Sequence, residues 1–377
     1  MAEKTFKQID WWLVLFVLPI VLAGLFTMKS FTPSDIGGSF FDKQIIWIIV
    51  SFGIFFIFSF IDFRFLRKTE VLVGLFLLFS FFLVALAFLG STVKGAQSWF
   101  SFGGFSFQPT DLMKLVLILV LAKYFSRRHV EIRNIKHIFI SAFYALIPFG
   151  LIILQPDFGS AMVIFLIWFG MVLVSGISKT HLALVFLGGA LAFASLWFFA
   201  FAPYQKARIV SFLNPLADVH NSGYNAMQST IAVGSGQITG KGLGFGTQSR
   251  LQFLPEPHTD FIFAAFAEEW GFIGSAFVLS LYGALVWRIL YLASIGASNF
   301  EMLFGIGVAV LFMSHVLVNI GMNLGLMPVT GLPLPFMSYG GSHLLAEFAS
   351  LGILMSMRRY ARSAHRDDIK NEFLGIS

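Results

Sequence analysis

The sequence predicts an all-α polytopic membrane protein that forms a single domain over residues 1–377. Hydrophobic residues make up 57% of the chain and charged residues only 12%, whereas soluble domains carry about 25% charged residues. The apolar residues occur in continuous runs and not in the alternating pattern of an outer-membrane barrel, which favours membrane-spanning helices. The chain contains no cysteine, which excludes disulfides, thiol chemistry and iron–sulfur sites.

Ten apolar runs are long enough to cross about 30 Å of hydrocarbon as helices. The run at 261–293 is too long for one straight crossing, so we expect a tilt or a break, with Gly271 and Gly274 as the weak points. The first run has no signal-peptide cleavage pattern and is interpreted as a retained span. The runs lie at 11–29, 44–62, 71–91, 110–126, 137–154, 159–177, 181–202, 261–293, 302–324 and 341–358.

The distribution of basic residues predicts that both termini are cytoplasmic. With ten spans, 17 of the 25 Lys and Arg residues fall on the side that holds both termini, and an excess of basic residues marks the cytoplasmic side. The long loop at 203–260, between the seventh and eighth runs, then lies outside. The excess of basic residues on the cytoplasmic side, where they can contact anionic lipid, accounts for the net charge of +6. A nucleic-acid partner is therefore not needed to explain this charge.

Two stretches interrupt the pattern of spans. The loop at 203–260 is rich in Gly, Asn, Gln and Thr, and a loop of this length is usually functional, with a solvated spacer as the alternative. The stretch at 325–340 contains Pro328, Pro333 and Pro335 among several glycines, which excludes a continuous helix. Non-helical backbone near membrane depth must be buried by protein or lined by water, so we expect this stretch to line a cavity.

Charged residues inside or at the edge of spans are candidate functional groups because the membrane penalises them. Asp111 and Lys114 are three residues apart on one helical face and can pair. Asp157 precedes an apolar run, where a helix N-cap is the alternative role. Glu268 and Glu269 lie two turns into the eighth run, and pairing with a basic group of a neighbouring span is the alternative to a functional role.

Histidine and the remaining acidic residues give weaker indications. Glu347 lies within the tenth run, and His315 and His343 are interpreted as packing residues because no metal-binding spacing connects them. Lys241 follows a glycine-dense run, 234–246, whose backbone could approach an anion; the P-loop order fails because Gly242 follows the lysine.

Asp260 stands at the outer mouth of the eighth run, after a loop rich in hydrogen-bonding groups. A carboxylate at this position could take a proton from a hydroxyl as a general base. Helix N-capping is the alternative, since any Asp before an apolar run can cap a helix.

Several segments resemble the SEDS family (shape, elongation, division and sporulation), and the resemblance extends from Asp10 to about Arg359. The entry at Asp10-Trp11 and the stretch from Gln228 to Gly236 resemble the elongation-type branch more than the division-type branch, which is the close alternative. The matching segments are Gln108 to Asp111, Gln155 to Ser160, Gly240 to Gln248, Leu254 to Phe263 and Pro328 to Ser342.

This resemblance implies a ten-span peptidoglycan glycosyltransferase in the bacterial cytoplasmic (inner) membrane. Such an enzyme polymerises lipid II into glycan strands on the outer face and releases undecaprenyl diphosphate. It implies a class B penicillin-binding protein and the MreC/MreD proteins as partners. The family's catalytic aspartate falls on Asp260, its loop lysine on Lys241, its acid and base at the start of the fourth span on Asp111 and Lys114, and its Gln-Pro-Asp acid on Asp157.

The matched segments also make Gln108, His258 and Ser338 candidate substrate-binding residues. The chain departs from the family in three places: Asp111 replaces a glutamate, His343 and Glu347 replace small and amide residues, and 95–99 lacks an arginine before its tryptophan. Without that arginine, the diphosphate is expected to depend on Lys94, Lys114 and Lys241. No metal-ligand set and no obligatory cofactor are predicted, with Mg²⁺ or Mn²⁺ at the diphosphate as an alternative source of positive charge.

Two other classes of function compete with this reading of the residues. A lipid-linked precursor flippase or another transporter would also contain broken helices and intramembrane charges. The two halves of the chain show no inverted repeat, and Asp260 is expected at the outer surface and not at the midplane, which favours the enzyme. A scaffold that only recruits a penicillin-binding protein would not need Asp260.

Overall fold

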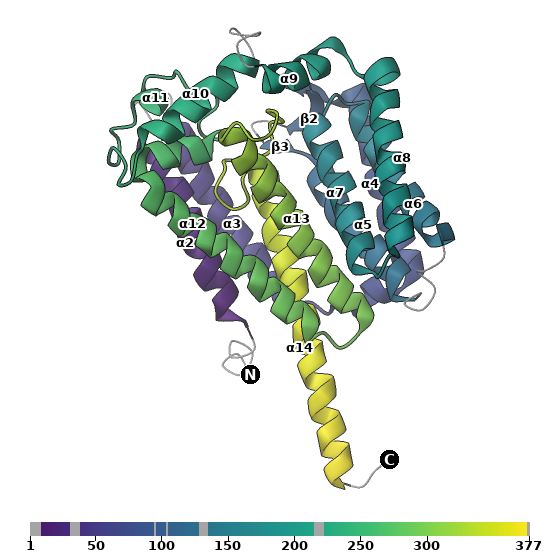
Figure 1. Cartoon of the computed structure of the whole chain (residues 1–377). Helices are drawn as coiled ribbons and strands as arrows, with labels where there is room; N and C mark the ends of the chain where they lie inside the picture. Colours follow the sequence, from purple (N-terminus) through teal and green to yellow (C-terminus); the bar gives the residue numbers. More distant parts are fainter. Residues whose placement is uncertain are drawn as a thin grey trace.

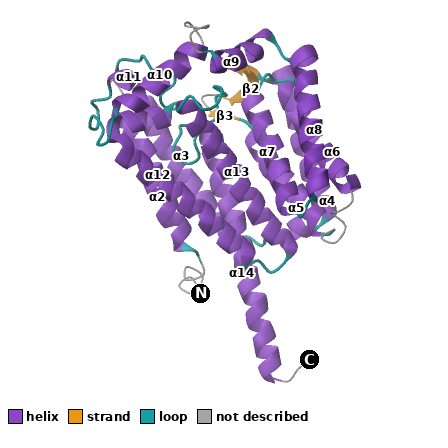
Figure 2. Cartoon of the chain, in the orientation of Figure 1, coloured by secondary structure: helices purple, strands orange, loops and turns teal. Residues whose placement is uncertain are grey.

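Helices form nearly all of the regular structure, and the long ones run between the same two ends of the molecule (Figures 1 and 2). The computed structural model describes residues 9–30, 38–93, 96–102, 105–127, 135–214 and 222–374. The long helices are α2 (Trp11–Ser30), α3 (Gly38–Phe60), α4 (Thr69–Leu89), α5 (Pro109–Ser126), α6 (Ile135–Ile153), α7 (Phe158–Val174), α8 (Lys179–Ser195), α12 (Ile262–Ser294), α13 (Asn299–Asn323) and α14 (Gly341–Leu374).

These helices confirm the predicted class, because each of the ten predicted runs overlaps one of them. The largest difference is at α14, which continues to Leu374 and not only to residue 358. Within the described residues, seven helices are long and apolar enough to cross a membrane. The other three are α5 and α14, which carry several charged residues, and α7, which is 17 residues long. The number of spans therefore stays a prediction, whereas a multi-pass helical membrane protein is what the fold shows.

The two ends of the bundle differ in what they carry (Figure 1). Helix α2 begins, and α14 leaves the body, at one end, which we call the terminus end. There, Asp10 forms ion pairs with Arg288, at 2.6 Å between Oδ2 and Nη2, and with Arg358. The short 3-10 helix η1 (Phe63–Arg67) also lies at this end, and its Arg67 pairs with Glu301. Ion pairs at the terminus end thus connect the start of α2 with α12 and α14, and connect η1 with α13.

The opposite end, which we call the loop end, holds two features that the sequence analysis missed. Three short strands, β1 (Ser91–Val93), β2 (Ala96–Phe102) and β3 (Phe105–Phe107), form an antiparallel sheet in the order β1-β2-β3, with Ser91 opposite Trp99 and Phe100 opposite Phe107. The stretch at 203–260 contains the helices α9 (Pro203–Leu213), α10 (Ser222–Ser235) and α11 (Thr247–Arg250). The five-residue π-helix η2 (Leu196–Ala200) precedes this stretch.

The large loop is therefore a structured layer, and the solvated-spacer alternative is wrong. Helix α10 buries Ala232 and Ser229 completely. The Ser229 hydroxyl donates a hydrogen bond of 2.9 Å to the backbone carbonyl of Asn323 at the end of α13. The composition of these helices resembles that of a loop, because they carry many polar residues. Helices of this kind depend on tertiary packing for their stability.

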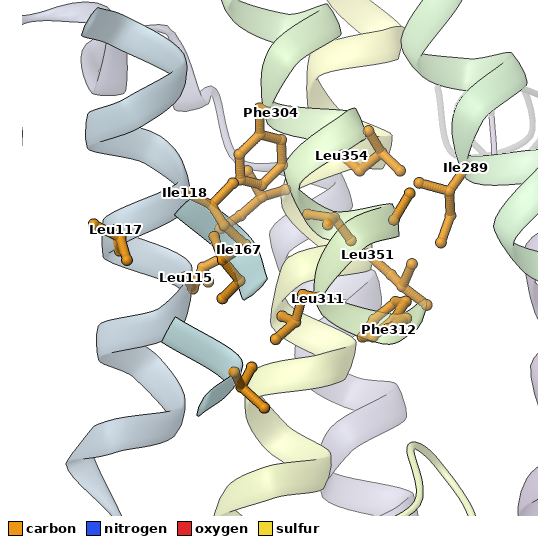
Figure 3. Packing of buried hydrophobic residues seen from close by; sticks show 14 of the residues in the cluster. Leu115, Leu117, Ile118, Ile167, Ile289, Phe304, Leu311, Phe312, Leu351 and Leu354 are labelled. Carbon is orange, nitrogen blue, oxygen red and sulfur yellow. The ribbon is translucent and has the colours of Figure 1, made fainter. Parts of the chain in front are cut away.

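The hydrophobic core lies around α13. Of the apolar window of α13, 72% is buried, against 22% for α3 and α4, so α13 is central and α3 and α4 are peripheral. Figure 3 shows side chains of α5, α7, α12, α13 and α14 meeting there, and the labelled ones are Leu115, Leu117, Ile118, Ile167, Ile289, Phe304, Leu311, Phe312, Leu351 and Leu354. Polar groups on α13 and its neighbours are consequently held inside a tightly packed bundle.

Helix α12 is interrupted where the sequence predicts a weak point. Gly271 has φ +63° and ψ −162°, outside the helical region. A Cβ added at Gly271 would lie 2.2 Å from the backbone nitrogen of Gly240, and the N–H of Phe272 donates to the carbonyl of Gln237 at 2.8 Å. The break therefore admits the glycine-dense run 234–246 against the backbone of α12.

Candidate active site

Residues 328–340, which we call the proline-rich segment, contain no helix, as predicted. Side chains from the surrounding helices bind its carbonyl groups. The Tyr282 hydroxyl donates to the carbonyl of Pro335 at 2.6 Å, and the Asn319 amide donates to the carbonyl of Leu332 at 2.7 Å. Protein thus satisfies this non-helical backbone. The small cavity described below is lined by α5, α13 and α14 and not by this stretch, and the expectation that the stretch lines a cavity stays a prediction.

The proline-rich segment is fastened to residues 258–260, just before α12. The Ser338 hydroxyl donates to the carbonyl of Thr259 at 2.6 Å and accepts from the N–H of Leu334 at 2.8 Å. The N–H of Tyr339 donates to the carbonyl of His258 at 2.8 Å. Two segments about 80 residues apart in the sequence, which both carried the family resemblance, therefore form one unit. Ser338, predicted to bind substrate, uses its hydroxyl inside this unit.

Asp260 lies in this unit, close to the start of α12. Its backbone carbonyl accepts hydrogen bonds from the amides of Asn319, at 2.9 Å, and Asn323, at 3.2 Å. A Cβ added at Gly331 would lie 3.5 Å from Oδ2 of Asp260, so the carboxylate faces the proline-rich segment at a residue without a side chain. Phe261 occupies the N-cap position of α12, so the N-cap alternative for Asp260 is wrong.

Sequence reasoning missed Asn319 and Asn323. The signal was present, because two amides four residues apart on an otherwise apolar span lie on one helical face. His258 packs its ring 4.4 Å from that of Phe40, and its Nε2 lies 3.4 Å from a carboxylate oxygen of Glu256.

A second group of site residues, which we call the buried cluster, comprises Asp111, Lys114, His315, His343 and Glu347. The predicted pair is confirmed: Lys114 Nζ lies 3.1 Å from Asp111 Oδ1, and both side chains are buried. The ring of His343 bridges two acids, with Nδ1 3.3 Å from Asp111 and Nε2 2.9 Å from Glu347. These groups surround a small cavity between α5, α13 and α14.

The two histidines of the buried cluster are not separate packing residues, as the sequence analysis interpreted them. Their ring centroids are 4.9 Å apart. Nε2 of His315 lies 3.4 Å from Nζ of Lys114, and its Nδ1 lies 3.2 Å from the carbonyl oxygen of Pro333. His315 therefore connects the buried cluster to the proline-rich segment.

Lys241 forms an ion pair with Glu268, with 2.7 Å between Nζ and Oε1. Glu268 is fully buried and also accepts hydrogen bonds from the N–H groups of Gln248 and Ser249. The alternative interpretation of Glu268 is correct in that a basic group pairs with it, but wrong about the source of that group, because Lys241 comes from the loop and not from a neighbouring span. The Lys241 side chain keeps 27% exposure, so its ammonium group can still meet a ligand from solvent.

The glycine-dense run around Lys241 packs against α12. A Cβ at Gly236 would lie 2.0 Å from the carbonyl oxygen of Ala267. The backbone N–H groups of Lys241 and Gly242 donate to the carbonyls of Glu268 and Glu269, both at 3.0 Å. The backbone N–H groups of Lys241 and Gly242, which were candidates for binding an anion, are thus used by α12.

Gln108 and Asp157 form a third pair, at the loop ends of α5 and α7. The Gln108 amide donates to Asp157 Oδ2 at 3.2 Å, and Asp157 Oδ1 accepts from the N–H of Ser160 at 3.0 Å, which confirms the N-cap role. A Cβ at Gly159 would lie 2.8 Å from the carbonyl oxygen of Thr330, so this pair also adjoins the proline-rich segment. Lys94 lies outside the described residues.

A divalent cation at the diphosphate is the alternative source of positive charge. Within the described ranges, no three His, Asp or Glu side chains are arranged to share a metal ion. The described residues therefore do not fit a metal site built by protein side chains alone, and a cation held by the diphosphate itself stays a prediction.

Comparison with known proteins shows which family this chain resembles. The model of the FtsW/RodA/SpoVE family, described as cell cycle proteins, matches residues 7–363. The peptidoglycan glycosyltransferase MrdB of Escherichia coli is 39% identical over 280 residues, covering 74% of this chain and 75% of MrdB. A probable peptidoglycan glycosyltransferase FtsW of Haemophilus influenzae is also 39% identical, over 285 residues, covering 74% of this chain and 71% of that protein.

Solved structures agree with the family match. A chain from work described as "Structural coordination of polymerization and crosslinking by a peptidoglycan synthase complex" has a TM-score of 0.80 at 32% identity, covering 94% of this chain and 98% of that one. The crystal structure of the Thermus thermophilus rod shape determining protein RodA has a TM-score of 0.69 at 31% identity, covering 93% and 97%. A second crystal structure of that RodA, with one aspartate replaced by alanine, has a TM-score of 0.68.

The fold and these relatives define a multi-pass membrane enzyme of the peptidoglycan glycosyltransferase class. Within that class, the chain belongs to the FtsW/RodA/SpoVE family, also called the SEDS family.

Proposed function

We propose that this enzyme polymerises lipid II at the loop end of the bundle, on the outer face of the bacterial cytoplasmic membrane, in the service of cell elongation. The observation that carries the proposal is the unit formed by residues 258–260 and the proline-rich segment. This unit holds Asp260 at the end opposite both termini, with its carboxylate next to Gly331. Positive-inside reasoning puts the terminus end in the cytoplasm, so Asp260 would meet substrates outside.

In this reaction, the 4-hydroxyl of a lipid-linked GlcNAc attacks the anomeric carbon of the growing chain. The Asp260 carboxylate takes the hydroxyl proton as a general base while undecaprenyl diphosphate leaves from the opposite face, so the anomeric configuration inverts. A carboxylate has the same task in inverting glycosidases. The carbonyl bonds from Asn319 and Asn323 fix the backbone of Asp260 and thereby orient its side chain.

The leaving diphosphate requires positive charge. Lys241 suits this task because its ammonium is partly exposed in the outer layer. Lys114 is buried and bound to Asp111, so we assign it to the internal support of the site, together with Gln108 and Asp157. His258, beside Asp260, is the further candidate for contact with the sugars.

A class B penicillin-binding protein is the proposed partner. The similarity to a chain of a peptidoglycan synthase complex that coordinates polymerisation and crosslinking supports this, and the MreC/MreD proteins are proposed as further partners. The elongation role draws support from the likeness to RodA and MrdB, whereas the equal identity to an FtsW keeps division as the alternative.

Polymerisation of lipid II by the purified protein, alone and with its penicillin-binding protein, tests the proposal. Asp260→Asn keeps the size of the side chain but removes the base, so glycan synthesis should stop. Asp62→Asn is the matched control, because Asp62 is an exposed aspartate that caps η1 at the terminus end. Glycan synthesis by Asp260→Asn at the rate of the control would remove Asp260 from the mechanism, and transport without polymerisation by the unmodified protein would favour the flippase.

A further inference from the structure

The backbone of the proline-rich segment is strained at Phe336. Its φ is +61°, in a region that a bulky residue rarely adopts. The side chain is buried, and its ring centroid lies 5.2 Å from that of Phe312 and 5.3 Å from that of Phe348. Strained backbone persists only where the surroundings hold it in place, and it occurs preferentially at functional sites.

The Glu347 side chain binds the backbone of this strained residue. Its Oε2 accepts the N–H of Phe336 at 2.9 Å, while its Oε1 lies 2.9 Å from Nε2 of His343. His343 in turn contacts Asp111, which pairs with Lys114. Glu347 therefore links the rest of the buried cluster to the proline-rich segment, with one carboxylate oxygen directed to His343 and the other to Phe336.

A short path of hydrogen bonds connects the backbone near Phe336 with the residues around Asp260. Ser338 follows two residues later and binds the carbonyl of Thr259, and Tyr339 binds the carbonyl of His258. A change of the backbone at Phe336 would shift these two bonds, and with them the segment that contains Asp260. His343 and Glu347 lie one helical turn apart on α14, and the structure pairs them with each other.

We propose that Glu347 is a positioning residue for the transferase reaction. Its carboxylate holds the strained turn at Phe336, and this turn sets the orientation of residues 258–260; Glu347 itself contacts no substrate. His343 supports it by fixing the rotamer of the carboxylate. This inference rests on the proposed function, because it takes Asp260 as the reacting base.

Three substitutions separate the roles of the Glu347 oxygens. Glu347→Gln keeps an oxygen that can accept the Phe336 N–H, although a neutral acceptor forms a weaker bond than a carboxylate. Glu347→Met keeps the length of the side chain but has no such acceptor. Glu347→Asp keeps the charge but is one methylene too short to reach Phe336.

Glu301 provides a matched control in the same protein. It is as buried as Glu347, at 3% exposure for each residue. One oxygen of Glu301 pairs with Arg67, and the other accepts the N–H of Ala297 at 2.8 Å. Glu301→Met thus removes the same two kinds of contact at the terminus end, away from Asp260.

The measurement is steady-state polymerisation of lipid II by each purified variant with its penicillin-binding protein, expressed per folded molecule. Because misplacement of a reacting group by about 1 Å can cost about a hundredfold in rate, we expect kcat of Glu347→Met to fall about tenfold or more, with KM within about twofold of the unmodified protein. Glu301→Met should lower thermal stability and leave kcat per folded molecule unchanged. Glu347→Gln should keep most of kcat.

The outcomes distinguish this inference from the proposed function. If Asp260→Asn is inactive while Glu347→Met and Glu301→Met have equal kcat, the positioning role of Glu347 is overturned and the base role of Asp260 stands. If Asp260→Asn is active, the proposed function itself fails. Should Glu347→Met not fold, the comparison of Glu347→Asp with Glu347→Gln decides. We expect Glu347→Asp to lose more kcat than Glu347→Gln, and any other order overturns the inference.

Discussion

The pair formed by Asp111 and Lys114 allows a quantitative test of the buried cluster. Lys114→Met removes the ammonium and leaves the Asp111 carboxylate inside the bundle. That carboxylate keeps His343 at 3.3 Å and the Ser342 hydroxyl at 3.5 Å. We therefore expect a loss of stability of about 3 kcal/mol, at the lower end of the range for breaking a buried pair.

The double change Asp111→Leu/Lys114→Met removes both charges. Replacement of a buried pair by apolar residues of similar volume is often close to neutral. His343 keeps Glu347 at 2.9 Å in this variant. The double variant should therefore be less destabilised than the single variant, by about 2 kcal/mol.

The assay is the fraction of detergent-purified protein that stays monodisperse after heating, measured over a temperature series. Leu115→Met is the matched control, because it introduces methionine at a buried neighbour without touching a charge and should cost less than about 1.5 kcal/mol. Equal midpoints for the single and the double variant would show that the two charges are not coupled, and would refute the reasoning.

Three further predictions follow from the outer layer and from α12. Lys241→Ala should impair polymerisation over a lipid II concentration series more than Lys241→Arg, since Arg keeps the positive charge; rates unchanged by either substitution would remove Lys241 from diphosphate binding. A cysteine replacing Ser222 in this cysteine-free chain should react with an impermeant maleimide in cells whose outer barrier has been opened, whereas one replacing Ser126 should react only after lysis; the reverse pattern would invert the topology. Gly271→Ala should cost about 1–3 kcal/mol because of its positive φ and its contact with the neighbouring run, while Gly283→Ala, in open space on the same helix, should not destabilise in a thermal melt.

The sequence alone determined the helical bundle. Hydrocarbon leaves no partner for exposed backbone groups, so each span must be a continuous apolar run, and such runs are visible without any tertiary information. The same holds for local features. The pairing of Asp111 with Lys114 depends only on helical spacing, and the break at Gly271 depends only on the length of the run and the position of its glycines.

The loop end was much less predictable from the sequence. Strands β1–β3 are short, and helices α9–α11 are short and carry many polar residues. Short helices of this kind depend on packing against the bundle for their stability. Ser229 shows this, since its bond to the carbonyl of Asn323 exists only once α10 lies on α13.

The sequence indicated which residues belong to the candidate site, but not which of them contact one another. Family resemblance indicated Asp260 and Lys241, whereas the partners of these residues lie far away in the sequence: Asn319 binds the carbonyl of Asp260, and Glu268 binds Lys241. His315 and His343, separate in the sequence, meet in one cluster with their ring centroids 4.9 Å apart. The apolar pattern fixes which residues enter the membrane, but it does not fix how the helices rotate and pack against one another, and that packing alone decides which buried polar groups become neighbours.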